Sequence, residues 1–387
     1  MGFHVAIYVE NYSSKMDGDI VEYTIDFETV NGAVRVFQTF FPDIDYNDTR
    51  FYSLRVPRTG RNRMFSGSWY FLPLSAFESS EYEPINEEAE GSAAYAGIIT
   101  LKNSIPNLSQ YLAAVEGEEY EIHEHIDIDF KTSPQELVVV SCGQGNWNEV
   151  HANKELLIYD MGASSRYTRS QVISLIQSRF SKFKGKVINI VISHWDMDHF
   201  QAIRYLDGKQ LAQIASIIGP SNIPSSNVYK SMIKHLMANN VSYSLIAPTS
   251  QRNGRTINLN LLSVSKTVDV YRSVSGGSRN QTGIVLVVKG KEKLALLTGD
   301  HHYEKIFDAI HKSYSSQKII LVVPHHGGNA GSLDVAGWRS EFSAIECPIS
   351  YGFNSFNHPH QNLSGLGLLQ GSVPQATHGS GDLTFGI

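Results

Sequence analysis

The chain has 387 residues, 42% of them hydrophobic, which is enough for two ordinary domains or one large domain with a real core. It contains no apolar run of about eighteen residues, and its N-terminal segment lacks the basic region and long apolar stretch of a signal peptide, so we expect a cytoplasmic protein without a membrane span. Cys142 and Cys347 are too few for a disulfide framework or a cysteine zinc site, so a bound metal must use histidine and carboxylate ligands.

The net charge of −6 conceals two parts of opposite sign. Residues 1–130 contain 8 Lys and Arg against 22 Asp and Glu, a net charge of −14, whereas residues 131–387 contain 24 against 16, a net charge of +8. This shift predicts two domains, with residues 1–130 as an acidic accessory domain of unknown family. Such a domain could shield a basic neighbour, recruit a protein partner or keep the chain in solution, and our hypothesis is that it regulates or targets residues 131–387.

Residues 1–130 have the pattern of an all-β sandwich or barrel. Segments rich in β-branched and aromatic residues alternate with clusters of Gly, Pro, Asn and Asp, and they cover residues 3–10, 20–27, 33–41, 50–56, 68–74, 96–101 and 119–130. Residues 43–48 resemble the opening of a calcium loop, but the glycine and the final glutamate of that loop are missing. The His and Asp residues that alternate over 123–129 are better explained as the solvated face of a half-buried strand than as a metal site.

Residues 131–387 alternate strand and helix patterns, which indicates an α/β layered domain. Apolar strand patterns cover residues 136–143, 156–162, 187–194, 283–290, 293–300, 318–327 and 347–354. Amphipathic helix patterns cover residues 169–183 and 303–314. Polar residues follow several of these strands directly, and ligand sites in layered α/β proteins gather at such strand ends.

The segment SHWDMDH, residues 193–199, follows one apolar strand and contains four residues able to bind a cation. His194 with Asp196, and Asp198 with His199, could each hold one ion, because imidazole and carboxylate are the usual ligands of Zn²⁺ and Mn²⁺ where no thiolate is available. Two cations would account for all four residues. The alternative is an ordinary strand-to-helix connection with an Asp N-cap, which would account for one aspartate and leave the other three residues unexplained.

Two segments later in the chain also carry possible metal ligands at the end of an apolar run. Asp300 stands where the apolar run LALLTGD stops, and His325 and His326 stand where IILVVPHHGG stops. A carboxylate at Asp300 could bridge two ions about 3.5 to 4 Å apart, and one histidine of the pair could complete a coordination sphere. Three further histidines lie in or beside a predicted helix and are expected at its surface: His301, His302 and His311.

These segments, in their order along the chain, resemble the metallo-β-lactamase superfamily, and within it the soluble domain of the DNA-uptake competence proteins called ComEC. The likeness runs over about residues 135–387 and rests on the segments CGQGN, LLIYDMG with Asp160, SHWDMDH, NQTGIVLVV with ALLTGD, VPHHGG, SYGFNSFNHPH and ATHGSGDLTF. It does not include the membrane-embedded parts of the competence proteins, so DNA transport is not implied.

The resemblance implies an αββα sandwich with a dinuclear site at its edge, and a hydrolase in which a hydroxide between two Zn²⁺ or Mn²⁺ ions is the nucleophile. It places six residues around the metals: His194, Asp196, Asp198, His199, Asp300 and one histidine of the pair, of which His325 is favoured over His326. Asp198 is then a catalytic metal ligand. His358 could stabilise the transition state or protonate the leaving oxygen, or it could make a structural hydrogen bond beside Pro359.

The chain departs from the family pattern at positions where other members carry acidic residues or a further histidine. These positions hold Ser141, Asn146, Asn280 and Thr282. A site with more oxygen and less nitrogen should tolerate Mn²⁺ at least as well as Zn²⁺.

Three classes of function are compatible with the sequence. A phosphodiesterase or nuclease is favoured, by the resemblance and by the +8 charge of residues 131–387, since basic surfaces attract phosphate backbones. Hydrolysis of a lactone, thioester or lactam is the second class. The third is a metal-binding sensor or interaction protein in which the β-rich domain carries the function.

Overall fold

A computed structural model describes most of the chain. The described residues are 4–13, 20–40, 52–57, 64–84, 95–101, 109–111, 122–124, 126, 128–164, 166–250, 257–276, 278–354, 358–359 and 362–387. They form two compact units: unit 1 is Met1–Glu118, Arg166–Thr168 and Pro224–His235, and unit 2 is Glu119–Ser165, Arg169–Ile223 and Leu236–Ile387. The single boundary near residue 130 stays a prediction, since two later segments of the chain join unit 1.

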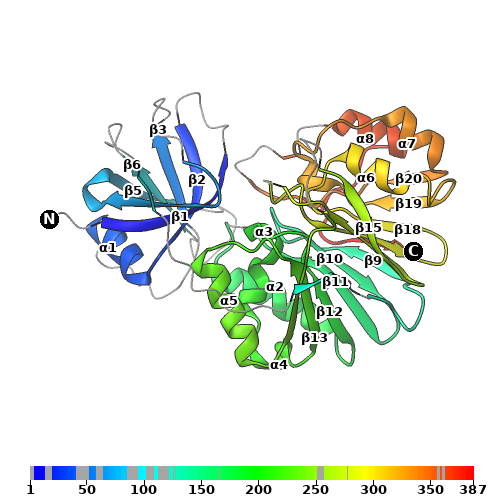
Figure 1. The fold of residues 1–387 in the computed structure, drawn as a ribbon, viewed down its shortest axis with the longest axis horizontal. Coiled ribbons are helices and arrows are strands. Elements are labelled where there is room, and N and C mark those ends of the chain that lie inside the picture. The colour runs from blue at the N-terminus through cyan, green and yellow to red at the C-terminus, as the bar shows by residue number, and fades with distance from the viewer. Residues whose placement is uncertain are drawn as a thin grey trace. The chain divides into compact units, whose positions relative to one another are not determined.

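Unit 1 is built on one seven-stranded sheet (Figure 1). In sheet order its strands are β5 (Phe77–Pro84), β6 (Tyr95–Leu101), β3 (Tyr52–Pro57), β2 (Ile20–Phe27), β1 (His4–Ser13), β4 (Ser68–Pro73) and β7 (Ser109–Tyr111). Neighbouring strands are antiparallel except β3 and β6, and the short helix η1 (Leu74–Ala76) joins β4 to β5. Ile7, Ile25 and Leu54 are fully buried in its core. The β-rich architecture expected for the first part of the chain is confirmed.

One strand expected in unit 1 is a helix. The pattern over residues 33–41 predicts a strand, but residues Val30–Phe40 form α1. Thr29 starts the helix, because its hydroxyl accepts a hydrogen bond from Gly32 N at 3.0 Å. Ala33 and Val36 are buried three positions apart, which is helical spacing. The prediction of a strand, which relied on the β-branched valines, is therefore wrong, because tertiary packing outweighs local strand propensity here. The residues of the calcium-like segment, 43–48, lie outside the described residues.

Residues 224–235 join unit 1 through hydrogen bonds to the end of β2. Asp26 is buried, and its Oδ2 accepts the backbone N–H of Val228 at 3.0 Å. The side chain of Asn227 donates to the carbonyl of Phe27 at 3.0 Å. These contacts fix the start of α5 (Asn227–Ala238), so unit 1 does not consist of the acidic N-terminal residues alone.

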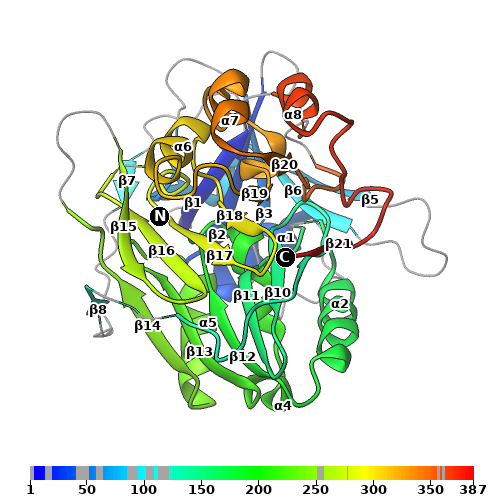
Figure 2. The same cartoon turned by 90° about the vertical axis from the view of Figure 1, so that its right-hand side faces the viewer.

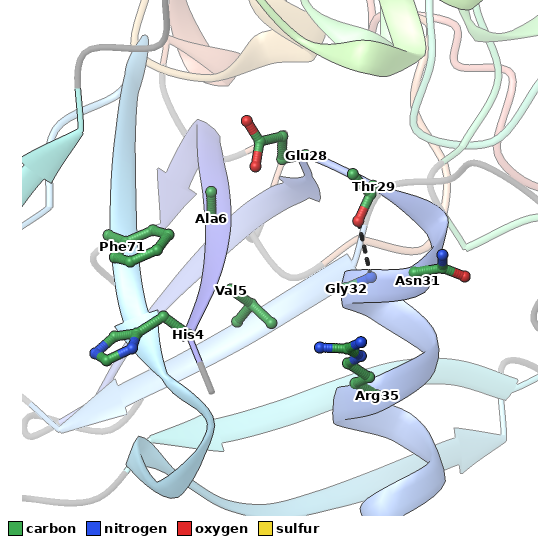
Figure 3. Close-up of a pocket in the computed structure, with 9 residues that line it drawn as sticks. All are labelled: His4, Val5, Ala6, Glu28, Thr29, Asn31, Gly32, Arg35 and Phe71. Carbon is green, nitrogen blue, oxygen red and sulfur yellow. Dashed lines mark hydrogen bonds between the residues drawn. The ribbon is translucent and has the colours of Figure 1, made fainter. Parts of the chain in front are cut away.

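Unit 1 also contains a pocket of about 190 Å³ beside the start of α1 (Figure 3). Glu28 and Arg35 line it together with apolar side chains such as Val5 and Phe71. Two groups of His, Cys, Asp and Glu in the described part of the chain could hold a metal, and neither lines this pocket. The candidate site therefore lies in unit 2.

The first sheet of unit 2 has eight strands with a parallel half. In sheet order they are β21 (Leu383–Gly386), β9 (Glu136–Val139), β10 (Trp147–His151), β11 (Glu155–Met161), β12 (Val187–Val191), β13 (Ile214–Pro220), β14 (Ser242–Ile246) and β8 (Ile122–His123). The pairs from β11 to β8 are parallel. The helix α2 (Arg169–Lys182), expected at 169–183, joins β11 to β12. Of the strand expected at 119–130, only the two-residue β8 is present among the described residues.

The second sheet of unit 2 has six strands. In sheet order they are β15 (Leu259–Val264), β16 (Val268–Ser273), β17 (Ile284–Lys289), β18 (Leu294–Leu297), β19 (Lys318–Leu321) and β20 (Ala344–Glu346). The helices α6 (Tyr303–Ile310), α7 (Val335–Glu341) and α8 (Leu363–Gln370) lie beside β18, β19 and β20 in both Figure 1 and Figure 2.

The two sheets of unit 2 face each other across one apolar core. Leu157 and Val191 of the first sheet and Leu286 and Ile320 of the second belong to the same buried cluster. A second cluster joins the outer face of the second sheet to its helices, and includes Ile306, Trp338 and Leu366. On the first sheet, α2 is the crossover between parallel strands, and such crossovers cover a face of their sheet. The αββα sandwich that the resemblance implied is confirmed.

The last strand expected in unit 2 is not formed. Residues 347–354, all of which are described, contain only an isolated bridge from Ile349 to Ala376. Strand β20 ends just before them at Glu346, and Pro348 has no N–H to donate to a neighbouring strand. Among the described residues, no helix is both long enough and apolar enough to cross a membrane.

Candidate metal centre

The polar residues singled out in the sequence lie where strands of both sheets end. Asp160 is the penultimate residue of β11, and His194 follows β12. Asp300 follows β18, and the histidine pair follows β19 in the short helix η3 (Pro324–Gly327). Because rigid strands carry these residues to one edge, short side chains can be aimed at a single point.

The segment after β12 does not have the geometry of an ordinary helix cap. Helix α3 (Met197–Phe200) begins after Asp196, but the Asp196 side chain makes no capping hydrogen bond. A short helix η2 (Gln201–Tyr205) and α4 (Gly208–Leu211) follow. The N-cap explanation for an aspartate in this segment is therefore not supported at Asp196.

Four of the expected ligands and His326 converge. His194 Nε2 lies 3.7 Å from Asp300 Oδ2, and His199 Nε2 lies 3.4 Å from Asp300 Oδ1. His326 Nε2 lies 3.3 Å from Asp198 Oδ2. Two groups follow in the described part of the chain, one of His194, His199 and Asp300 and one of Asp198, His199 and His326. In each group the ligand atoms lie within 4.8 Å of one another.

Hydrogen bonds on the far side of the rings fix the orientation of His194 and His199. His199 Nδ1 donates to Asp160 Oδ2 at 2.8 Å, and His194 Nδ1 donates to Ser193 Oγ at 3.0 Å. Ser193 Oγ in turn donates to Asp160 Oδ2 at 2.8 Å, and the Ser193 backbone N–H donates to Asp160 Oδ1 at 2.6 Å. A histidine held through Nδ1 in this way presents Nε2 to a metal.

His326 is also held through its Nδ1, which donates a hydrogen bond to the carbonyl of Ser350 at 2.8 Å. The Nε2 atoms of His194, His199 and His326 and the Oδ1 atom of Asp300 are buried without a hydrogen-bond partner among the described residues. Each such atom costs about 1–3 kcal/mol unless something else satisfies it. A divalent cation could satisfy those of one ligand group, and nitrogen and carboxylate donors suit Zn²⁺ or Mn²⁺. The residues present therefore fit a metal ion.

The charges at the centre also favour a cation. Burial would raise the pKa of Asp300, but the neighbouring His325 and His199 hold that pKa well below its usual range. Burial would lower the pKa of His199, but the carboxylates of Asp160 and Asp300 raise that pKa well above its ordinary value. These carboxylates thus favour positive charge at this position, and a metal ion would supply such charge.

Three residues around the centre have left-handed backbone conformations, which are rare for residues other than glycine. Asp160, His325 and His326 have φ angles of 58°, 53° and 52°. Non-glycine residues in this region cost about 1–3 kcal/mol each and cluster at functional sites. Gly162 allows a close approach, because a Cβ atom there would lie 1.6 Å from the carbonyl oxygen of Asp198. The fold thus maintains strain where the candidate ligands are presented.

The two histidines of η3 have different surroundings. The sequence favours His325, but His326 is the one that joins Asp198 and His199. His325 Nδ1 instead hydrogen-bonds the Oδ2 atom of Asp300. Asn280 Nδ2 donates to the same oxygen at 3.0 Å.

Asp196, the remaining expected ligand, lies against a cation of the protein itself. Arg279 Nε is 3.3 Å from Asp196 Oδ1, and Arg279 Nη1 donates to the carbonyl of Trp195 at 2.8 Å. Asp196 Oδ2 lies 3.6 Å from His194 Nε2, yet Asp196 belongs to neither group of potential ligands in the described residues. Burial would raise the pKa of Asp196, but the charge of Arg279 more than offsets this and lowers that pKa.

His358, expected as a second catalytic residue, lies beside the histidine pair. Its ring centroid is 5.1 Å from that of His325 and 6.4 Å from that of His326. Its backbone is fixed by Asn354, whose side chain accepts the His358 N–H and donates to the His358 carbonyl, both at 3.0 Å. Gln144 Nε2 lies 3.3 Å from His358 Nδ1.

The expectation that the histidines near α6 lie at the surface is wrong for His301. This residue is 2% exposed, and burial lowers its pKa to about 3. The helix begins only at Tyr303, so His301 lies in the buried connection from β18 and not on the helix surface. His302 and His311 are half-buried; Gln281 lies 2.8 Å from His302, and His311 donates to the carbonyl of Phe307.

Comparison with known proteins gives matches among solved structures only. No family model and no curated protein matches the chain. The matched structures include metallo-β-lactamase-fold proteins. One of them is the metallo-β-lactamase-fold protein YhfI from Bacillus subtilis, with 9% identity and a TM-score of 0.39; the match covers 66% of this chain and 100% of YhfI. Human tRNase Z, short form, has 14% identity and a TM-score of 0.37, covering 56% and 93%.

A third match is a metallo-β-lactamase from Thermotoga maritima that is described as putative, with 12% identity and a TM-score of 0.29, covering 43% of this chain and 79% of its own. The αββα arrangement and the ligand geometry rest on the coordinates of the chain itself.

Several residues of the centre escaped the sequence interpretation as functional residues. Ser193 and Arg279 are ordinary polar residues in sequence, and their role depends on contacts with Asp160 and Asp196. Asp160 is the penultimate residue of a strand, a position that signals a site only when its partner is known. The strand-end rule that identified Asp300 could have identified Asp160 as well.

Proposed function

We propose that this chain is a metal-dependent hydrolase that cleaves phosphodiester bonds, with nucleic acid as the expected substrate. The observation that carries the proposal is the set of buried, unpartnered Nε2 atoms of His194 and His199, which face Asp300, and of His326, which faces Asp198. Nitrogen and oxygen donors oriented from behind by further hydrogen bonds are typical of metal centres and rare elsewhere in a core.

The residues that would hold metal are those of the two potential ligand groups, Asp198 with His199 and His326, and His194 with His199 and Asp300. A divalent cation bound there would supply positive charge to a phosphoryl oxygen and lower the pKa of water to about 7. The two ions implied by the resemblance would both use Asp300. In this proposal His326 takes the place that the sequence assigned to His325.

His358 is the candidate proton donor of the reaction. When Gln144 donates to its Nδ1, the ring proton of neutral His358 resides on Nε2. When the ring takes up a second proton, the resulting imidazolium can give its Nε2 proton to the oxygen that leaves when a phosphodiester is cleaved, and the ring returns to its neutral form. Asn354 holds the backbone of His358 on both sides and so keeps the ring near the metal ligands.

The choice of a phosphodiester over other substrates rests on charge. Residues 131–387 carry a net charge of +8 within a chain of net charge −6. A basic surface concentrates polyanions and speeds their encounter with a site. A lactone, thioester or lactam would gain nothing from such a charge.

The test uses the full-length protein freed of metal with EDTA and then loaded with Mn²⁺ or Zn²⁺. We expect cleavage of plasmid DNA and of labelled DNA and RNA oligonucleotides that requires added metal, and little turnover of chromogenic esters or lactams. Asp300→Ala should abolish the cleavage. Asp308→Ala is the matched control, because it removes an exposed carboxylate from α6 and should retain the wild-type rate.

The outcomes separate the parts of the proposal. Turnover of esters or lactams without cleavage of any nucleic acid would exclude the phosphodiester substrate but would still support a metal-dependent hydrolase. A protein that takes up no metal by elemental analysis, or whose activity is indifferent to EDTA, would exclude the metal-dependent mechanism altogether.

A further inference from the structure

The ion pair between Asp196 and Arg279 occupies one side of the candidate centre. Asp196 is the residue that the sequence pattern offers, with His194, to a first cation. Its Oδ1 atom lies 3.3 Å from Arg279 Nε, and the residue is 6% exposed. A guanidinium is permanently charged, so it neutralises this carboxylate at every pH at which the protein is folded.

Arg279 is anchored on both sides. Its Nη1 donates to the carbonyl of Trp195 at 2.8 Å. Trp195 is itself fully buried, and its indole N–H donates to the carbonyl of Pro220 at 2.7 Å. The guanidinium therefore contacts a fixed part of the core, and moving it away from Asp196 would break this hydrogen bond together with the ion pair.

The remaining ligands are sufficient for one ion at a time. The two potential ligand groups share His199. Its Nδ1 is held by Asp160, so the ring offers the single lone pair of Nε2, which can bind one cation. When His199 serves the group with Asp198 and His326, the other side of the centre has His194 and an oxygen of Asp300. Two protein ligands are too few for tight transition-metal binding.

We infer that the centre binds one cation tightly, at Asp198, His199 and His326, and that Arg279 neutralises Asp196 in place of a second cation. This inference rests on the proposed function for the identity of the site and departs from it in the number of ions. Arg279 is thus a positioning residue that sets the metal content, and His194 with Asp300 forms at most a weak second position.

The test measures Mn²⁺ binding to the full-length, EDTA-treated protein by equilibrium dialysis with elemental analysis. We expect wild type to bind one Mn²⁺ per chain tightly and a second at least about tenfold more weakly, since partners of ligands change metal affinity by about 10- to 100-fold. Arg279→Met keeps the length of the side chain and removes its charge, so the second ion should bind about tenfold more tightly or better. Arg339→Met, an exposed arginine on α7, is the matched control and should bind like wild type.

Electron paramagnetic resonance of the Mn²⁺ gives a second measurement that does not depend on activity. At a free Mn²⁺ concentration that fills only the tight position of wild type, wild type should show the hyperfine pattern of isolated ions, whereas Arg279→Met should show an exchange-coupled pair. Two ions of similar affinity in wild type, or identical isotherms for wild type and Arg279→Met, would overturn the inference.

A further variant covers the case in which Arg279→Met does not fold. Asp196→Asn should keep the tight ion within a few-fold of its wild-type affinity, and loss of that ion would contradict the assignment of the tight position. The proposed function can fail separately. A protein that binds one Mn²⁺ tightly but hydrolyses nothing would support this inference and contradict the proposed activity. A protein that binds no Mn²⁺ would contradict both this inference and the proposed function.

Discussion

Asp160 Oδ2 accepts the Nδ1–H of His199 at 2.8 Å, and both residues are fully buried. The same carboxylate accepts hydrogen bonds from the hydroxyl and the backbone N–H of Ser193 and from Asn146 Nδ2. Asp160 therefore orients His199 toward the centre without being one of its potential ligands.

This relationship predicts the behaviour of Asp160→Asn. The amide has the shape of the carboxylate but lacks its charge, so His199 Nε2 should become a poorer ligand. Metal affinity should fall by about 10- to 100-fold, as is typical for partners of metal-bound histidines. Equilibrium dialysis with Mn²⁺ measures this, and circular dichroism checks the fold. A folded variant with wild-type affinity would show that Asp160 serves packing alone.

Removing a direct ligand should be more severe. Asp300→Ala and Asp198→Ala should each lower the hydrolysis rate by at least about 10³-fold, because a missing metal removes both the reactive water and the charge that stabilises the leaving oxygen. His302→Ala is the matched control, since His302 contacts Gln281 and not the ligand groups. Its rate should stay within a few-fold of wild type. Near-normal rates in the two aspartate variants would contradict the site assignment.

The two histidines of η3 should differ. His326 Nε2 lies 3.3 Å from Asp198 Oδ2 and has no hydrogen-bond partner among the described residues, so His326→Ala should weaken Mn²⁺ binding by about 100-fold or more. His325 instead donates to Asp300 Oδ2, and His325→Ala should cost about tenfold or less. Isotherms on both variants decide the question, and the opposite order would restore the assignment made from the sequence.

The buried His301 should make stability depend on pH. Burial lowers its pKa from 6.5 to about 3, so the unfolded chain binds more protons than the folded one between these pH values. The contribution of neutral His301 is therefore complete above about pH 6.5 and decreases as the pH falls toward 3. In urea unfolding of EDTA-treated protein at pH 7 and pH 5, wild type should lose up to about 1.4 kcal/mol per pH unit more than His301→Gln. Equal slopes would mean that His301 becomes protonated in the folded state.

Local patterns in the sequence predicted six of the fourteen strands in the two sheets of unit 2, and the residues proposed for the centre. Strand β18 and all but the last residue of β17 are continuous apolar runs, and a buried strand needs little beyond such a run and a stop. The four candidate ligands from His194 to His199 lie within six consecutive residues, so their chemistry is visible before any folding. Asp300 was identified in the same way, from its place at a strand end.

The tertiary structure alone decided what depends on contacts between distant segments. His325 and His326 have the same chemistry and adjacent positions, and only the left-handed backbone of η3 determines which of them faces Asp198. Arg279 is 83 residues from Asp196 in the sequence, and no local pattern pairs them. The strand expected at 33–41 became α1 for the same reason, because burial of Ala33 and Val36 against the sheet outweighs the strand propensity of valine.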